Sequence, residues 1–126
     1  MATTFSLLNS LLPLTLTIVG ISAYANEAAC PKFHGGARLV TVSIFDGPPS
    51  EHADLMPDRF RTTKDGSSSE WDVAYVFQAG RKLFVECKYG KKAAPVVMKP
   101  SPRTTKCTFI DQDRGPRSLT CVFPSG

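Results

Sequence analysis

Four cysteines limit how this chain can fold more than any other feature of the sequence. The chain has 126 residues, and an apolar, uncharged run from Leu7 to Ile21 precedes a small-x-small cleavage motif at Ala23–Ala25. This combination predicts a secretory signal peptide over residues 1–25. An even number of cysteines in a small exported domain favours two disulfides over free thiols. The cysteines all follow the predicted cleavage site and are Cys30, Cys87, Cys107 and Cys121.

Two alternatives to a cleaved signal peptide are a membrane anchor and a lipoprotein signal. The apolar run is short for a membrane helix, which needs about 20 residues. Glu27 occupies the position where a lipobox has a large apolar residue, and lipidation of Cys30 would leave three cysteines unpaired. We therefore expect a single disulfide-stabilised β domain over residues 26–126, with no membrane span after signal cleavage.

Four cysteines allow three disulfide pairings. The last two predicted strands cover residues 104–110 and 118–123, and reflecting the chain about Arg114 places Cys107 opposite Cys121. We favour a disulfide across this hairpin, which leaves the two earlier cysteines for each other, while the other pairings stay open. A zinc site would need C-x-x-C pairs, which the sequence lacks, so no metal is predicted.

The stretch Glu70–Gly90 (EWDVAYVFQAGRKLFVECKYG) predicts a central β-hairpin. Residues 71–77 and 83–89 both alternate with the two-residue period of half-buried strands. Gly80 lies midway, where a tight turn favours a residue that tolerates positive φ. The expected cross-strand pairs are Phe77–Leu83, Tyr75–Val85, Val73–Cys87 and Trp71–Tyr89.

The rest of the chain predicts short elements around this hairpin. Residues Arg38–Phe45 have the pattern of a strand, and the turn chemistry after Asp46 ends it. We expect a short helix over Ser50–Met56, an exposed loop over Arg59–Ser69, and an edge strand over Ala94–Lys99 that is bounded by prolines. The predicted fold is mainly β: a small antiparallel sandwich or partly open barrel with one short helix and two disulfides.

Residues of the types used in catalysis occur without a catalytic arrangement. The acidic residues between Asp46 and Asp72 fall mostly in a polar loop and at a predicted helix start. His34 and His52 lack evident partners for a metal or a general base, and the serines of residues 67–69 lack a G-x-S-x-G setting. We therefore predict that the protein is not an enzyme and that it uses no cofactor.

Charge is unevenly distributed along the chain, which has a net charge of +4. Between Arg81 and Lys106 the only acidic residue is Glu86, whereas acids outnumber bases between Asp46 and Asp72. A basic hairpin favours an acidic protein partner or an anionic envelope polymer, and export argues against nucleic acid. The alternative is a solvated lysine face that protects edge strands from aggregation.

Two segments are candidates for binding a protein partner. One is the tip after the first long strand, where two consecutive prolines make a rigid protrusion that loses little entropy on binding; its alternative is a simple strand-to-helix turn. The other is the end of the basic hairpin. The candidate partner-binding residues are Asp46, Gly47, Pro48, Pro49, Glu51, Lys88, Lys91 and Lys92.

Three segments together resemble a known family. They are Val42–Pro49 (VSIFDGPP) with an acidic stretch up to Asp58, then Trp71-Asp72, and then Val85–Tyr89 (VECKY). In these segments the chain resembles a family of small exported proteins of Gram-negative bacteria, which carry a V-x-V/I-F-D-G-P-P segment and a C-R/K-Y strand. The resemblance covers nearly the whole mature chain, and Lys88 stands where the family more often has arginine.

The resemblance implies a role in immunity, because some members of the family lie near type VI secretion genes. It implies a periplasmic protein that binds a cell-wall-acting enzyme and occludes its active site. A looser similarity to periplasmic lysozyme inhibitors, which are also small, exported and mostly β, implies the same mode of action. The two rival hypotheses are a binding module for an anionic envelope component, which uses the basic hairpin, and an unrecognised hydrolase with converging carboxylates.

Overall fold

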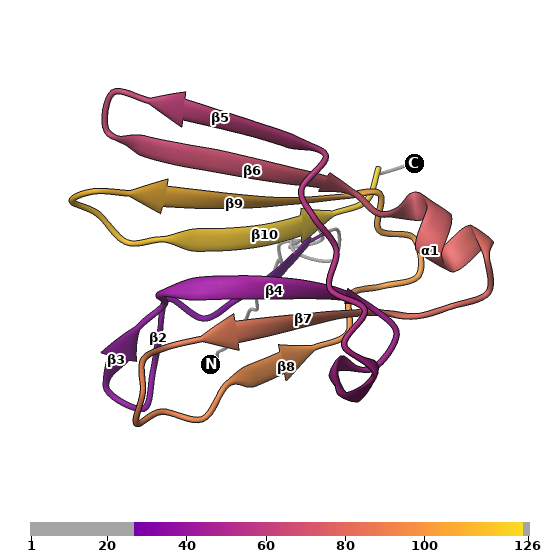
Figure 1. Cartoon of the computed structure of the whole chain (residues 1–126), viewed down its shortest axis with the longest axis horizontal. Coiled ribbons are helices and arrows are strands. Elements are labelled where there is room, and N and C mark those ends of the chain that lie inside the picture. Colours follow the sequence, from indigo (N-terminus) through magenta and orange to yellow (C-terminus); the bar gives the residue numbers. More distant parts are fainter. Residues whose placement is uncertain (1–26, 125–126) are drawn as a thin grey trace, which may run out of the picture.

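A computed structural model of the chain describes residues 27–124, so the predicted signal peptide lies outside the described residues. Two antiparallel sheets share one buried core, and a short helix, α1, lies at one end (Figure 1). The sheets have the strand orders β1-β10-β9-β6-β5 and β4-β7-β8. The prediction of a mainly β, antiparallel fold with one short helix is confirmed, and the sheets do not form a closed barrel. No helix within residues 27–124 is long and apolar enough to cross a membrane.

The elements follow a simple division between the two sheets. The five-stranded sheet contains β1 (Glu27–Ala29), β5 (Arg59–Thr63), β6 (Gly66–Asp72), β9 (Lys106–Gln112) and β10 (Ser118–Val122). The three-stranded sheet contains β4 (Thr41–Asp46), β7 (Leu83–Lys88) and β8 (Val96–Met98). The remaining elements are the small hairpin of β2 (Phe33–His34) and β3 (Ala37–Arg38), the 3-10 turn η2 (Pro49–Glu51) and α1 (Ala74–Gln78).

The core lies between the inward faces of the two sheets. Along β7, Leu83, Val85 and Cys87 are buried while the residues between them are only half-buried. This is the alternation that the sequence predicts for a strand with one face on a core. Trp71 and Phe109 contribute the largest apolar groups of the five-stranded sheet to the same cluster.

Both disulfides have the favoured pairing. Cys107 and Cys121 lie directly opposite each other on β9 and β10, with their Cα atoms 4.0 Å apart. Cys30 is bonded to Cys87, a residue 57 positions away, which ties the segment after β1 to the middle of the other sheet. The first disulfide therefore cross-links neighbouring strands, and the second joins parts of the chain that are distant in sequence.

The predicted hairpin over Glu70–Gly90 is wrong. β6 pairs with β5 and β9, whereas β7 pairs with β4 and β8, so the two segments belong to different sheets. Between them the chain forms α1, in which Val76 is buried and Tyr75 is about half exposed. Val73, Val76 and Phe77 have the i, i+3, i+4 spacing of a helix face, which a short apolar run can satisfy as well as a two-residue period.

Two further predicted elements differ from the structure. The segment predicted as a helix over Ser50–Met56 contains only the end of η2, because its backbone pairs with the edge of β4 instead: Leu55 N–H donates to Ile44 O at 2.7 Å. The segment predicted as a loop over Arg59–Ser69 forms the β5–β6 hairpin. Its Asp-Gly turn chemistry marks a hairpin turn between two polar strands rather than a long loop.

Candidate functional site

The two surfaces predicted to bind a partner lie at opposite ends of the β4–β7 ladder. In its register Asp46 lies opposite Leu83, whereas Thr41 lies opposite Lys88. The tip, defined as residues 46–51, is therefore at the end that carries α1, and the lysines are near the β7–β8 turn (Figure 1). The structure does not bring the two groups together, so each is a separate surface.

The tip is held in place by the segment that follows α1. The carboxylate of Asp46 accepts hydrogen bonds from Arg81 Nε at 2.6 Å and Arg81 Nη2 at 2.8 Å, and Gly47 N–H donates to Lys82 O at 2.8 Å. Gly47 is buried with φ of 100°, a left-handed conformation that favours glycine. The exposed residues of the tip are Pro48, Ser50 and Glu51.

The predicted lysines differ in how far the fold already uses them. Lys88 Nζ donates a hydrogen bond to Ser43 Oγ at 2.9 Å and lies 3.6 Å from Glu86 Oε1. Lys91 and Lys92 are exposed and make no ion pair within the described residues. Lys88 therefore contributes to the outer face of its sheet, while the other two ammonium groups are free.

One hollow of the surface begins at the C-terminal end of α1. There Gly80 N–H donates to Phe77 O at 2.9 Å and Arg81 N–H donates to Val76 O at 3.0 Å, the two hydrogen bonds of a Schellman motif. Gly80 has φ of 78°, as this motif requires of its C′ residue. The motif stops the helix and places Arg81 and Lys82 on the surface just before β7 begins.

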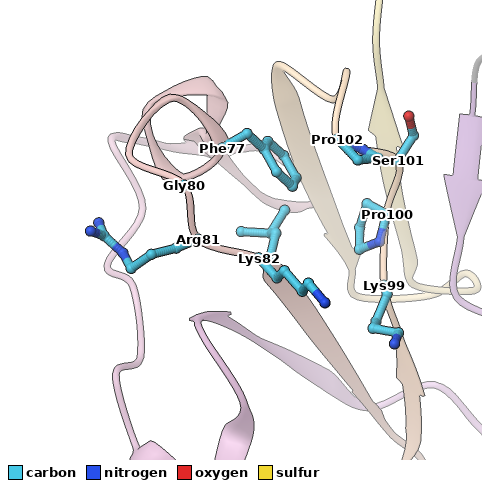
Figure 2. A pocket seen from close by; sticks show the side chains of 9 residues that line it. Phe77, Gly80, Arg81, Lys82, Lys99, Pro100, Ser101 and Pro102 are labelled. Carbon is cyan, nitrogen blue, oxygen red and sulfur yellow. The ribbon is translucent and has the colours of Figure 1, made fainter.

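A pocket of about 440 Å³ lies between this helix end, the start of β7 and residues 99–102. Figure 2 shows its apolar side chains facing one another across the hollow, with Lys82 and Lys99 at one end. Two of the apolar residues, Leu83 and Pro100, are buried and form its base. The apolar lining of the pocket consists of Phe77, Leu83, Pro100 and Pro102.

The basic side chains around the pocket are of two kinds. Arg81 points away from it in Figure 2 and is engaged by Asp46. Lys82 and Lys99 make no ion pair in the part of the chain that the structure describes, and Lys99 Nζ lies 5.9 Å from the centroid of the Phe84 ring. An apolar hollow with two unpaired cations at its rim suits a ligand that combines an apolar group with an anionic group.

Two neighbouring carboxylates are already paired with one arginine. On the outer face of the five-stranded sheet, Arg59 Nε donates to Glu70 at 2.7 Å, and its two terminal nitrogens donate to Asp72 at 2.9 Å. These hydrogen bonds hold the pKa of both carboxyls below their usual range. Both groups are therefore ionised at neutral pH, which does not suit a general acid. No group of three or more metal-ligating side chains occurs among residues 27–124.

A second hollow of about 350 Å³ lies at the open edge between the two sheets. Met56 and Phe60 border it and are largely exposed. The carboxylate of Asp111, which also lines it, is bound by Arg117 Nε at 2.6 Å. Asp54 also lines the hollow, is exposed and makes no ion pair within the described residues. This hollow therefore combines apolar surface with one free carboxylate and has no free cation in its lining.

Sequence reasoning missed the pocket, although it found the charges around it. Lys82 and Lys99 belong to the basic stretch between Arg81 and Lys106, but the predicted site did not include them. The predicted hairpin was wrong: it paired Phe77 with Leu83 across two strands. It therefore predicted a strand where the structure has α1, whose C-terminal end forms one side of the pocket. The usable signal was Gly80 followed by two basic residues, since a C′ glycine favours cations in and after the last helical turn.

The fold and this surface define a small disulfide-linked β domain whose free charges and apolar hollow suit the binding of another protein. Residues 33–122 match the family described as "Type VI secretion system Tli immunity protein". The chain therefore belongs to this family of immunity proteins, and membership supports a protein that binds a toxic effector. The matched segment contains every strand except β1. Neither the curated proteins nor the solved structures give a match.

Proposed function

We propose that this immunity protein is exported to the periplasm, where it binds a cell-wall-acting effector and occludes its active site. The observation that carries the proposal is the family match over residues 33–122, which spans nearly the whole described domain. The predicted signal peptide and the two disulfides support export, because disulfides persist in oxidising compartments such as the periplasm.

Occlusion rather than chemistry is the mode of action that the surface favours. The tip is a short protrusion whose conformation is fixed by the Asp46–Arg81 ion pair and by two prolines, Pro48 and Pro49. A fixed protrusion loses little conformational entropy when it enters a cleft. We assign partner contacts to the exposed part of the tip, with Glu51 as its charged group, and to the free lysines of the β7–β8 turn.

The first experiment tests immunity and location together. A toxic effector encoded beside the gene is directed to the periplasm of a test strain, with the immunity protein present in full or without residues 1–25. We expect survival only with the exported form. The control is the truncated protein in a strain whose cytoplasm permits disulfide formation, because there it can fold in the wrong compartment. Protection by this cytoplasmic form would remove the periplasmic part of the proposal.

The second experiment identifies what the effector attacks. The purified effector is incubated with peptidoglycan sacculi or with phospholipid vesicles, and the immunity protein is added in stoichiometric amount. We expect digestion of the sacculi and its arrest by the immunity protein. Digestion of the vesicles alone would retain immunity but replace the cell wall by the membrane as the target. Absence of binding between the two proteins would remove the proposed function.

The rival binding module predicts a different salt dependence. Attachment to an anionic envelope polymer through lysines alone weakens steeply as salt rises, because screening shortens the range of surface charges to about 8 Å at 0.15 M and 3 Å at 1 M. A complex with an effector that includes apolar contacts persists at high salt. Pull-down from an envelope extract at low and high salt distinguishes the two.

A further inference from the structure

We propose that the pocket at the end of α1 receives an effector segment in which an acidic side chain lies next to an apolar one. This inference rests on the proposed function and adds to it a contact surface and the chemistry of the partner. The apolar side chain would lie between Phe77 and Pro102, and the carboxylate would lie between Lys82 and Lys99 at the end of the pocket where both amino groups are found (Figure 2).

The pocket is preformed. Its floor is made by buried side chains, Leu83 and Pro100, and one wall is fixed by the Schellman motif at Gly80. The opposite wall contains Pro102 and a turn in which Thr104 N–H donates to Ser101 O at 2.9 Å. Rigid walls reduce the entropy lost on association, so contacts here yield more affinity than contacts to flexible surface.

The charge at the rim of the pocket complements an acidic partner. A lysine ammonium beside an apolar wall attracts a carboxylate more strongly than one in open solvent, since the partner's apolar group excludes water from the contact. Within residues 27–124 no carboxylate forms an ion pair with Lys82 or Lys99, whereas the neighbouring Arg81 forms one with Asp46. The unpaired cations are therefore available for a partner, and the paired one positions the tip.

The pocket also lies close to the tip. Gly47 N–H donates to the carbonyl of Lys82, so the tip and the rim of the pocket are parts of one continuous surface. A partner that receives the tip in its cleft therefore comes within reach of the pocket. The lysines of the β7–β8 turn, which the sequence favoured, lie at the other end of the ladder.

An anionic membrane surface would also attract lysines, but the geometry favours a protein. Membrane recognition by charge uses clusters of roughly four to eight basic residues on one surface. Here two free lysines border a bounded apolar hollow, which is suited to single side chains. A vesicle of anionic lipid is therefore included in the test as the competing ligand.

The test compares two charge-reversal variants with equal change in net charge. The first is Lys82→Glu with Lys99→Glu. The matched control is Lys64→Glu with Arg114→Glu, in which both residues are exposed, make no ion pair within the described residues, and lie in turns at the end of the molecule away from α1. Circular dichroism and thermal unfolding verify that both variants are folded.

Binding is measured by calorimetry with the effector that the wild-type protein neutralises, and by co-sedimentation with vesicles that contain phosphatidylglycerol. We expect the pocket variant to bind the effector about 100-fold more weakly, because two attractions become repulsions, and the control to stay within about threefold. A compensating Asp/Glu→Lys change in the effector that restores binding would identify the acidic residue.

Several outcomes would overturn the inference. Equal weakening of effector binding in both variants would indicate attraction by the overall charge of the protein rather than binding in the pocket. Unchanged effector binding in the pocket variant, or a loss confined to the vesicles, would assign the pocket another role while the proposed immunity function remained intact. Failure of the wild-type protein to bind the effector would instead remove the proposed function and this inference with it.

Discussion

The outer face of the five-stranded sheet and the pocket end of the three-stranded sheet use charge in opposite ways. On the first, Arg59 lies between Glu70 and Asp72, so the cation and both carboxylates have partners on neighbouring strands. At the second, Lys82 and Lys99 have no such partners among the described residues. Charges satisfied within the fold stabilise strand register, and charges left free remain available for a partner.

This difference extends to the covalent cross-links. Cys107–Cys121 joins two adjacent strands of the five-stranded sheet and closes a short loop with a sequence separation of 14. Cys30–Cys87 anchors the N-terminal segment to β7, the strand that follows the pocket, and its sequence separation is 57. One sheet is therefore reinforced locally, while the sheet that carries the pocket depends on a long-range tie.

Removing each disulfide tests this comparison with the largest expected effect. Replacing Cys30 and Cys87 by alanine should lower the free energy of unfolding by about 4 kcal/mol, and replacing Cys107 and Cys121 by about 3 kcal/mol, because a longer closed loop restricts the unfolded chain more. All four cysteines are buried, so the cavity left by each change is similar. Urea unfolding of both double variants gives the order. A greater loss for the short loop would contradict the comparison.

A single substitution in each region separates stability from recognition. Arg59→Ala should lower the midpoint of thermal unfolding by less than the removal of either disulfide and leave effector binding unchanged. Lys82→Ala should weaken effector binding and leave the midpoint of thermal unfolding unchanged, because it removes a free cation and no internal ion pair. Arg59→Lys is the control for geometry, since lysine keeps the charge but loses the fork that binds two carboxylates. Equal effects of both alanine variants on binding would remove the distinction between the regions.

How much the sequence predicts depends on how local the interactions are. The β9–β10 pairing and its disulfide were predictable because their register is symmetrical about Arg114, within one turn of the chain. The pairing of β6 and β7 was not predictable in this way, because both strands pair with segments that are distant in the sequence: Trp71 pairs with Cys107, and Val85 pairs with Ile44. Tyr75 marks the error, because a strand would place it on the buried face and α1 leaves it about half exposed.

The pocket was likewise hard to predict, because it depends on residues that are distant in the sequence. The basic stretch is visible in the sequence because it needs only a count of charges. Which of its residues are free depends on distant partners: Arg81 is neutralised by Asp46, and Lys88 is engaged by Ser43. The apolar walls come from α1 and from residues 99–102, which only the fold brings together. A sequence can therefore predict the sign of a surface more readily than its shape.

Acid titration sharpens the comparison through a smaller effect. The hydrogen bonds from Arg59 lower the pKa of Glu70 and Asp72 below their ordinary values of 4.5 and 3.8. A carboxyl whose pKa is lower in the folded state contributes stability above its ordinary pKa, and this contribution is lost as the pH falls through the folded value. At pH values below about 4.5, the midpoint temperature of thermal unfolding should therefore decrease in the wild-type protein, and it should decrease less steeply in Arg59→Ala.

The Lys82→Ala variant is the control for this prediction. It should retain the wild-type slope, because no carboxylate depends on that lysine within the described residues. An equal slope in the Arg59→Ala and wild-type proteins would show that the paired face contributes nothing to acid stability.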